Sequence, residues 1–285
     1  MEKDTHTQQD VSQTTPNTLD ELPIHHIYEP NYIALFANHF PGLKIAEYLS
    51  KCAPYDEVRA LYLTGENKEN DENIIKALGI SREKVFFGKD VLKDEEHLSW
   101  LSKQGLDTII CVYWPWLLKE NVFTLASKTI NFHPALLPIN RGWFPHVHSI
   151  IDGSKTGVTL HKIDKGADTG DIWAQKEIPL LSTDTAKDIY DRLQHEIVKL
   201  FEDKWEDIKF DKVSPTPQNH DQATYHSKNE ITALDHIDLE KTYKAKDLIG
   251  KLKARTFGNR GFSYFEENGE KVYVNIKLSK TNSFE

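Results

Sequence analysis

The sequence predicts an α/β fold in which helices cover both faces of a parallel sheet, followed by a small C-terminal α+β lobe. Between Tyr32 and Val112, short apolar runs alternate with amphipathic segments of about ten residues, as is typical of strands and crossover helices. Beyond Trp205 this alternation stops, and proline-rich and polar segments replace it. A chain of 285 residues can bury a sizeable core in one or two domains.

The apolar runs before Trp205 are too short for helices and are interpreted as strands. Helices are expected where apolar residues recur at helical spacing, and the clearest stripe contains Ile189, Leu193 and Ile197. We expect strands at residues 32–36, 58–63, 85–87, 108–112, 129–132 and 157–162, and helices around 45–49 and at 72–78, 95–103 and 185–201. Ligands of such sheets gather at the carboxyl ends of the strands, which here carry residues 113–117 and 131–133.

The C-terminal part has its own pattern. Residues 213–219 are typical of a linker, and a helix is expected at 245–256. Asn268-Gly269 lies between strand-like runs at 262–265 and 271–278 and predicts a hairpin. The predicted organisation is a disordered arm at 1–22, an α/β domain at 23–207 and a lobe at 208–285 whose hairpin is suited to pair with a second subunit.

Composition narrows the class of protein. The formal net charge of −9 gives no overall electrostatic footprint for nucleic acid. The N-terminal residues lack the pattern of a signal peptide, and no run of about twenty apolar residues occurs, so we expect a soluble cytoplasmic protein that does not span a membrane. Cys52 and Cys111 lie in apolar surroundings and are expected to be buried thiols rather than a disulfide.

Asn131, His133 and Asp168 are the candidate catalytic side chains. Asn131 and His133 alternate along a predicted strand and therefore point to the same side, and Asp168 follows the next strand-like run in a glycine-rich turn. An amide and an imidazole can donate hydrogen bonds to a developing oxyanion, and a carboxylate can orient the imidazole or relay a proton. No Ser or Cys nucleophile accompanies them, which favours direct acyl transfer between two substrates. The structural alternative is a capped strand end with a hydrogen-bonded histidine.

Two further stretches are candidates for ligand contacts. Tyr113-Trp114-Pro115-Trp116-Leu117 follows a predicted strand and offers an apolar wall for a heteroaromatic ring, although core packing is the ordinary role of such residues. Arg141 has the geometry to bind a carboxylate or phosphate, or else to brace its own loop.

Other cofactor motifs are missing from the sequence. There is no G-x-G-x-x-G after the first predicted strand and no Walker lysine. His146 and His148 lack a third ligand at metal spacing, so no metal site is predicted.

Four ordered motifs make this sequence resemble the folate-dependent formyltransferase family. They are Asn-Phe-His-Pro-Ala-Leu-Leu-Pro at 131–138, Arg-Gly at 141–142, Gly-Val-Thr at 157–159 and Asp-Thr-Gly-Asp-Ile at 168–172. The family includes glycinamide ribonucleotide transformylase, methionyl-tRNA formyltransferase and the sugar-nucleotide N-formyltransferases. The resemblance extends from about Tyr32 to about Trp205, with a weaker likeness to the sugar branch beyond.

The resemblance implies a Rossmann-like domain that uses N10-formyltetrahydrofolate as donor and an amine as acceptor. It implies that Asn131, His133 and Asp168 are catalytic, with His133 and Asn131 holding the oxyanion and Asp168 orienting His133 and receiving the proton of the amine. It places the pterin between Tyr113 to Leu117 and the turn that begins with Ile163 and Asp164.

The acceptor is expected to be a nucleotide-linked amino sugar. From Glu206 onward acidic and basic side chains are equal in number, whereas a tRNA-binding lobe should be basic. An aromatic ring of the lobe could stack on a base, and an arginine could meet a pyrophosphate. The substrate-binding candidates are Asn140, Arg141, Trp143, Tyr225, Arg255 and Phe257.

The likeness to the sugar branch also implies a homodimer and a place in polysaccharide biosynthesis. The alternatives are a methionyl-tRNA formyltransferase, a formyltransferase for another small amine, and a folate-binding protein without turnover. The sequence identifies neither the sugar, the amino position nor the nucleotide.

Overall fold

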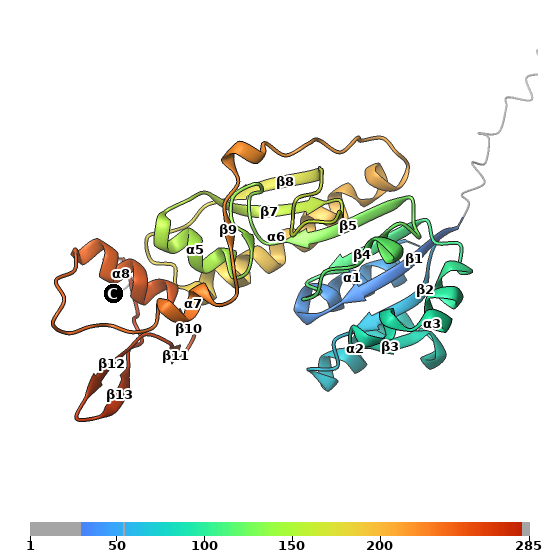
Figure 1. Ribbon diagram of the computed structural model, residues 1–285. Coiled ribbons are helices and arrows are strands. Elements are labelled where there is room, and N and C mark those ends of the chain that lie inside the picture. The colour runs from blue at the N-terminus through green and yellow to red at the C-terminus, as the bar shows by residue number, and fades with distance from the viewer. Residues whose placement is uncertain (1–29, 54, 281–285) are drawn as a thin grey trace, which may run out of the picture.

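A computed structural model describes residues 30–53 and 55–280, so the predicted arm at 1–22 lies outside the described part. Its centre is a seven-stranded sheet with the order β3-β2-β1-β4-β5-β7-β8 (Figure 1). The strands are β1 (Asn31–Ala37), β2 (Asp56–Leu63), β3 (Val85–Phe87), β4 (Thr108–Val112), β5 (Lys128–His133), β7 (Thr156–His161) and β8 (Ile172–Ile178). The α/β fold class is confirmed.

The sheet is not parallel throughout. The five strands from β3 to β5 are parallel, but β7 runs antiparallel to both β5 and β8. Only residues 162–171 connect β7 to β8, and a parallel pair requires a longer crossover connection, usually a helix. The prediction of a parallel sheet is therefore right for its first five strands.

Helices cover both faces of the sheet. Alternate residues of β1 enter two separate cores, with Ile33 and Leu35 in one and Ala34 and Phe36 in the other. Because β1 is buried on both faces, its sequence is continuously apolar from Ile33 to Ala37. The first core is closed by α1 (His39–Cys52), α2 (Lys68–Leu78) and α6 (Ala186–Lys209), and the second by α3 (Glu95–Ser102) and α4 (Glu120–Phe123).

Helix α6 is longer than the sequence predicts. A capping box between Thr185 and Asp188 begins it. Its buried face continues through Trp205 and Ile208 and ends with the buried Lys209. The predicted boundary at 207/208 therefore lies within its last turn. Helix α2 also begins earlier than predicted, because the side chain of Asn67 caps it.

Residues 210–280 form an extended connection and a small lobe at one end of the molecule (Figure 1). The predicted hairpin is present, and Asn268 and Gly269 have the positive φ angles that its tight turn requires. Before the lobe, β9 (Tyr225–His226) pairs with β6 (Arg141–Gly142) of the main domain. The lobe contains α7 (Glu230–Ala233), α8 (Ala245–Ala254), β10 (Thr256–Phe257), β11 (Arg260–Gly261), β12 (Tyr264–Glu267) and β13 (Glu270–Tyr273).

The two cysteines are both free, but they differ in exposure. Cys111 is buried as predicted, whereas Cys52 is exposed in the last turn of α1, so its predicted burial is wrong. Among the described helices, none combines the length and apolar character that a membrane span requires.

A buried ion pair ties the end of α6 to the sheet. Lys209 Nζ lies 2.7 Å from Asp56 Oδ1, and Trp205 Nε1 donates to Asp56 Oδ2 at 2.6 Å. Asp56→Asn should lower the free energy of unfolding by about 3–5 kcal/mol, because it leaves the buried Lys209 charge with only the half-exposed Glu206, 3.9 Å away, as an acidic partner. Urea unfolding measures this loss.

A suitable control is Lys128→Ala. Lys128 forms an ion pair with Asp211, and the side chain of Asp211 is largely exposed to solvent. This substitution should cost no more than about 1 kcal/mol. Equal losses in the two variants would contradict the special role of the buried pair.

Candidate active site

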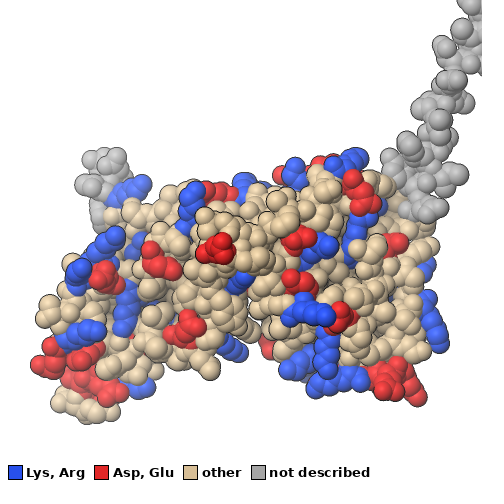
Figure 2. Space-filling model, turned by 45° about the horizontal axis from the view of Figure 1, so that its top comes forward, with Lys and Arg blue, Asp and Glu red and all other residues tan. Residues whose placement is uncertain are grey.

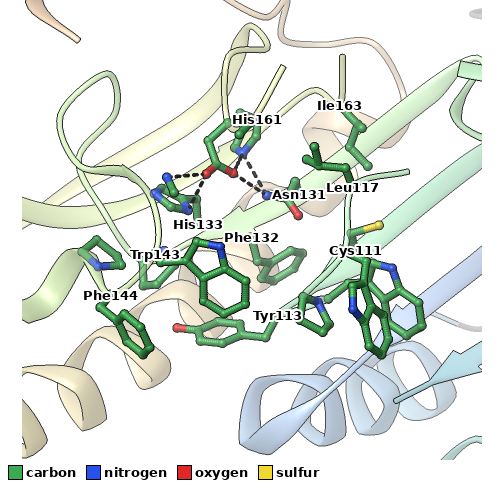
Figure 3. Close-up of a pocket in the computed structure, with 18 of the residues that line it drawn as sticks. Cys111, Tyr113, Leu117, Asn131, Phe132, His133, Trp143, Phe144, His161 and Ile163 are labelled. Atoms are coloured by element: carbon green, nitrogen blue, oxygen red, sulfur yellow. Dashed lines mark hydrogen bonds and ion pairs between the residues drawn. The ribbon is translucent and has the colours of Figure 1, made fainter. Parts of the chain in front are cut away.

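A cavity of about 360 Å³ opens at the carboxyl ends of the central strands (Figure 3). Asn131 and His133 reach it from β5, His161 from the end of β7, and Asp168 from the connection between β7 and β8. The register places Asn131 directly opposite His161. The antiparallel β7 therefore adds a histidine that sequence reasoning gave no specific role.

The carboxylate of Asp168 is the centre of this group. Its Oδ1 accepts from Asn131 Nδ2 at 3.3 Å and lies 3.5 Å from His161 Nε2. Its Oδ2 accepts the backbone N–H of Gly142 at 2.9 Å and lies 3.5 Å from His133 Nδ1. Figure 3 shows these side chains converging at the cavity wall. The structure thus brings together the Asn, His and Asp that the sequence nominated.

Asp168 is held ionised. Burial alone would raise its pKa, but the positive charge that His133 and His161 carry when protonated, together with the hydrogen bond from Gly142, holds the pKa of this carboxyl well below its usual range. The backbone of Asp168 has φ +55°, a left-handed conformation that Asp tolerates better than most residues.

His133 is a neutral imidazole with a defined tautomer. Burial lowers its pKa, and the opposing effect of Asp168 does not offset it. Its Nε2 lies 2.9 Å from the backbone carbonyl of Asn140. Because a carbonyl oxygen only accepts, the ring hydrogen is on Nε2, and the lone pair of Nδ1 faces Asp168. Nδ1 is therefore the atom that can take up a proton.

His161 fixes the orientation of the Asn131 amide. His161 Nδ1 donates to the carbonyl of Lys162 at 2.7 Å, so its Nε2 accepts from Asn131 Nδ2 at 2.9 Å. The same Nδ2 faces the Asp168 carboxylate, which cannot donate. Asn131 therefore has its Oδ1 free of these contacts, as Figure 3 shows.

The aromatic segment after β4 lines the same cavity. The ring centroids of Trp114 and Trp116 lie 4.9 Å apart edge to face, and Trp114 also packs on Phe36 in the second core. Trp114 thus packs in the second core and also lines the cavity. Leu117 lies at the rim of the cavity and is 70% exposed. Tyr113 has φ +56°, an unusual conformation for an aromatic residue, at the point where the chain turns into the cavity.

The turn opposite this segment is built by Asp164. Asp164 Oδ1 accepts from Gly166 N at 3.0 Å and from Thr169 Oγ1 at 2.5 Å, which folds the connection back toward Asp168. Asp164 and Ile163 line the cavity, as do Trp143 and Tyr225.

Four predicted substrate contacts do not line this cavity. Asn140 is fully buried, and Arg255 is buried in an ion pair with Asp235 at 2.5 Å. Phe257 packs against Tyr190. Arg141 donates to Gln218 Oε1 at 2.6 Å, and Gln218 Nε2 donates to the carbonyls of Asp168 and Gly170. The bracing role that the sequence left open for Arg141 is the one its contacts show.

Sequence reasoning missed several cavity residues. His39, Phe144, His146 and Tyr190 line it. His39 begins α1 two residues after the end of β1, so its position beyond a strand end was the available signal. Tyr190 lies on α6, and the sequence predicted for this helix only an apolar face that packs in the core. Cys111 also lines the cavity, but burial raises the pKa of its thiol, so it is no nucleophile at neutral pH.

One group of possible metal ligands lies outside the cavity. His148, His226 and Glu230 bring their ligand atoms within 4.8 Å of one another, although they are far apart in the sequence. The rings of His148 and His226 are stacked, with centroids 3.5 Å apart and planes within 4°. Lone pairs in two parallel ring planes do not converge on one ion, so this arrangement does not fit a metal.

Comparison with known proteins identifies the family. A family model described as formyl transferase matches residues 62–203, and one described as N-formyltransferase dimerization C-terminal domain matches residues 230–280. The chain belongs to the formyltransferase family. The resemblance noted in the sequence is thereby confirmed, and the second match covers most of the C-terminal lobe.

Individual relatives fall in two branches of this formyltransferase family. The chain is 34% identical over 155 residues to a dTDP-4-amino-4,6-dideoxyglucose formyltransferase of Mycobacterium tuberculosis, covering 53% of this chain and 64% of the relative. It is 28% identical over 200 residues to a methionyl-tRNA formyltransferase of Sulfurihydrogenibium sp., and this match covers 70% of this chain and 63% of the relative. These matches span less than two thirds of each relative.

A solved structure extends the likeness over nearly the whole fold. The crystal structure of a 4-N formyltransferase from Francisella tularensis superposes with a TM-score of 0.74 at 26% identity, covering 88% of this chain and 98% of that one.

The electrostatics of the site predict a pH-dependent stability. The pKa of Asp168 lies below its unfolded value of about 3.9, so its stabilising contribution is present above that pH and is lost as the pH falls through the folded pKa. Urea unfolding of the wild type and of Asp168→Asn should therefore differ more at pH 5 than at pH 3. A difference that stays constant over this interval would show that the carboxylate is not held ionised by its surroundings.

Proposed function

We propose that this protein transfers a formyl group from N10-formyltetrahydrofolate to the amino group of a nucleotide-linked amino sugar. The observation that carries the proposal is the neutral His133, whose unprotonated Nδ1 lies beside the ionised Asp168 and Asn131 in a partly aromatic cavity. Membership of the formyltransferase family and the activities named for its relatives support it.

The residues after β4 suit the folate. Trp114 Nε1 is buried and has no hydrogen-bond partner within residues 30–53 and 55–280, so a polar donor lies in the wall where Tyr113 to Leu117 would hold a pterin opposite Ile163 and Asp164. When bound, N10-formyltetrahydrofolate supplies the electrophilic formyl carbon.

His133 acts as the general base in this proposal. Its Nδ1 takes the proton that the attacking amine loses, and the carboxylate of Asp168 stabilises the imidazolium. The Oδ1 of Asn131 is placed to accept a hydrogen bond from the amine. These roles differ from the predicted oxyanion contacts, because Asn131 Nδ2 and His133 Nε2 already donate to protein acceptors. After proton transfer, Nδ1–H of His133 lies beside the Asp168 carboxylate and would return the proton to the departing nitrogen of the folate as the bond between that nitrogen and the formyl carbon breaks.

The acceptor would enter past Trp143 and Tyr225. Tyr225 lines the cavity and is 57% exposed, which leaves its ring free to stack on a base. Lys228 Nζ lies 4.9 Å from the centroid of the Trp143 ring and places a positive charge near this entrance. A nucleoside diphosphate has both an aromatic base and negative charge, so it suits these groups.

A methionyl-tRNA acceptor is the second candidate, since relatives with that activity match the chain. Figure 2 shows Lys and Arg interspersed with Asp and Glu over the displayed face rather than gathered in one basic tract. The phosphate backbone of tRNA is bound by positively charged surfaces, so this distribution favours the smaller acceptor. The dimerization match supports a homodimer.

The direct test is a panel of acceptors. Purified protein would be incubated with N10-formyltetrahydrofolate and with dTDP-, UDP- or CMP-linked amino sugars or initiator methionyl-tRNA, and products would be weighed by mass spectrometry. We expect a mass increase of one formyl group on at least one sugar nucleotide. Formylated tRNA without formylated sugar would contradict the proposed acceptor.

Substitution of the catalytic candidates tests the chemistry. His133→Ala should lower kcat by about 10²–10⁴, the usual contribution of a general base. Asn131→Ala should lower it by about 10²–10³, as loss of a transition-state hydrogen bond commonly does. Thermal unfolding and folate binding serve as controls for the fold. Turnover near the wild-type rate in either variant would remove that residue from the mechanism.

A further inference from the structure

A chain of hydrogen bonds runs from the candidate base to the C-terminal part of the protein. His133 Nε2 donates to the backbone carbonyl of Asn140 at 2.9 Å. The side chain Oδ1 of Asn140 lies 3.1 Å from His226 Nε2, and His226 Nδ1 lies 3.0 Å from Glu230 Oε2. The chain thus links β5 to β9 and α7 through one buried asparagine.

The orientation of the Asn140 amide is fixed by two serines. Asn140 Nδ2 donates to Ser149 Oγ at 2.8 Å and to Ser154 Oγ at 3.1 Å. Ser149 uses its own hydrogen on the carbonyl of Pro145, so its oxygen must accept from the amide. The Oδ1 of Asn140 therefore faces His226 as an acceptor, and His226 Nε2 must carry a hydrogen.

His226 is held in this orientation on its other sides. Its ring stacks on His148 of α5 (Pro145–Asp152), and its Nδ1 faces Glu230. Hydrogen bonds from Ser227 and His226 lower the pKa of Glu230 to about 2, and the Glu230 carboxylate lies 3.0 Å from His226 Nδ1. The ring cannot turn without losing the stack or one of its two hydrogen bonds.

Asn140 depends on these contacts because its backbone is unusual. It has φ +59°, the left-handed conformation in which its carbonyl meets His133. In the described part of the chain, its other partner besides His133, the serines and His226 is Thr224 Oγ1, which accepts from the Asn140 backbone N–H at 2.7 Å and lies 3.4 Å from Asn140 Oδ1. Loss of the His226 contact would leave Oδ1 with the weaker of its two partners.

We propose that His226 is a positioning residue: through Asn140 it keeps the ring hydrogen of His133 on Nε2, and so leaves Nδ1 free to take the proton of the substrate amine. The kinetic part of this inference rests on the proposed formyl transfer, whereas the tautomer of His133 does not. The lobe that follows β9 thereby takes part in setting the protonation of the site, without touching a substrate.

Two substitutions at His226 separate the hydrogen bond from the stack. His226→Phe keeps a flat ring against His148 and removes the two ring nitrogens, including the Nε2 that contacts Asn140. His226→Gln restores an N–H close to the position of Nε2. The matched control is His195→Phe, because His195 is an exposed histidine of α6 that packs on Phe40 and has no part in the site.

Two readouts are taken on each full-length variant. The tautomer of His133 is read by long-range 1H–15N NMR with 15N-labelled histidine, and its signals are assigned as those missing from a His133→Asn sample. Steady-state kinetics with N10-formyltetrahydrofolate and the accepted amine give kcat and both KM values. Thermal unfolding reports on the fold.

The proposal expects three results together. His226→Phe loses the Nε2–H signature of His133, and its kcat falls by about 10- to 100-fold while each KM stays within about twofold, because a share of the general-base contribution is lost. His226→Gln regains the signature and most of kcat. His195→Phe behaves as the wild type.

Other results would contradict the positioning role of His226 or the proposed function. An unchanged His133 signature in folded His226→Phe would overturn the proposal, whether or not kcat falls. If His226→Phe does not fold, His226→Leu replaces it, since it also removes the ring nitrogen that contacts Asn140, and an unchanged signature there overturns the proposal too. Wild-type protein that formylates no acceptor would refute the proposed function, while the NMR result still decides the positioning role.

Discussion

The structure of the site depends on one buried carboxylate. Asp168 receives hydrogen bonds from a backbone amide and a side-chain amide and lies beside two imidazoles. A carboxylate can remain ionised away from water only when such partners replace its hydration. These contacts therefore also fix where the neighbouring β6, β5 and β7 can lie. Arg141 and Gln218 hold the backbone of the same turn, so its geometry is determined from both sides.

The sequence predicted that these side chains lie together, but not which of their atoms donate and which accept hydrogen bonds. Asn131, His133 and Asp168 were visible because their motifs are short, ordered and placed at strand ends. Their donor and acceptor roles follow from His161 and from the carbonyl of Asn140, which the β5–β7 register and a left-handed backbone bring into contact. Such pairings depend on three-dimensional geometry, so they could not be predicted from residue types alone.

The fold, too, was predicted in its elements but not in every spatial relationship between them. Short apolar runs predicted β1 to β5 because parallel strands buried on both faces contain nearly continuous apolar segments, such as residues 33–37 of β1 and 109–112 of β4. They did not reveal that β7 turns back, since strand direction leaves no mark in apolar periodicity. Asn140 and Arg141 were expected at the substrate because they are polar residues in a loop near the site. Both are buried, and their polar groups are satisfied within the protein.

The pairing of β6 with β9 makes the C-terminal part structurally inseparable from the catalytic centre. Gly142 lies at the junction, where it donates to Asp168 and pairs with His226. An added Cβ at Gly142 would lie 2.3 Å from the carbonyl oxygen of His226, and its φ of +85° disfavours any other residue. Glycine is thus required where β9 approaches the site most closely. The segment that follows β9 is matched by a family model described as a dimerization domain, and the contacts of His226 with Glu230 and Asn140 connect the start of that segment to the loop beside His133.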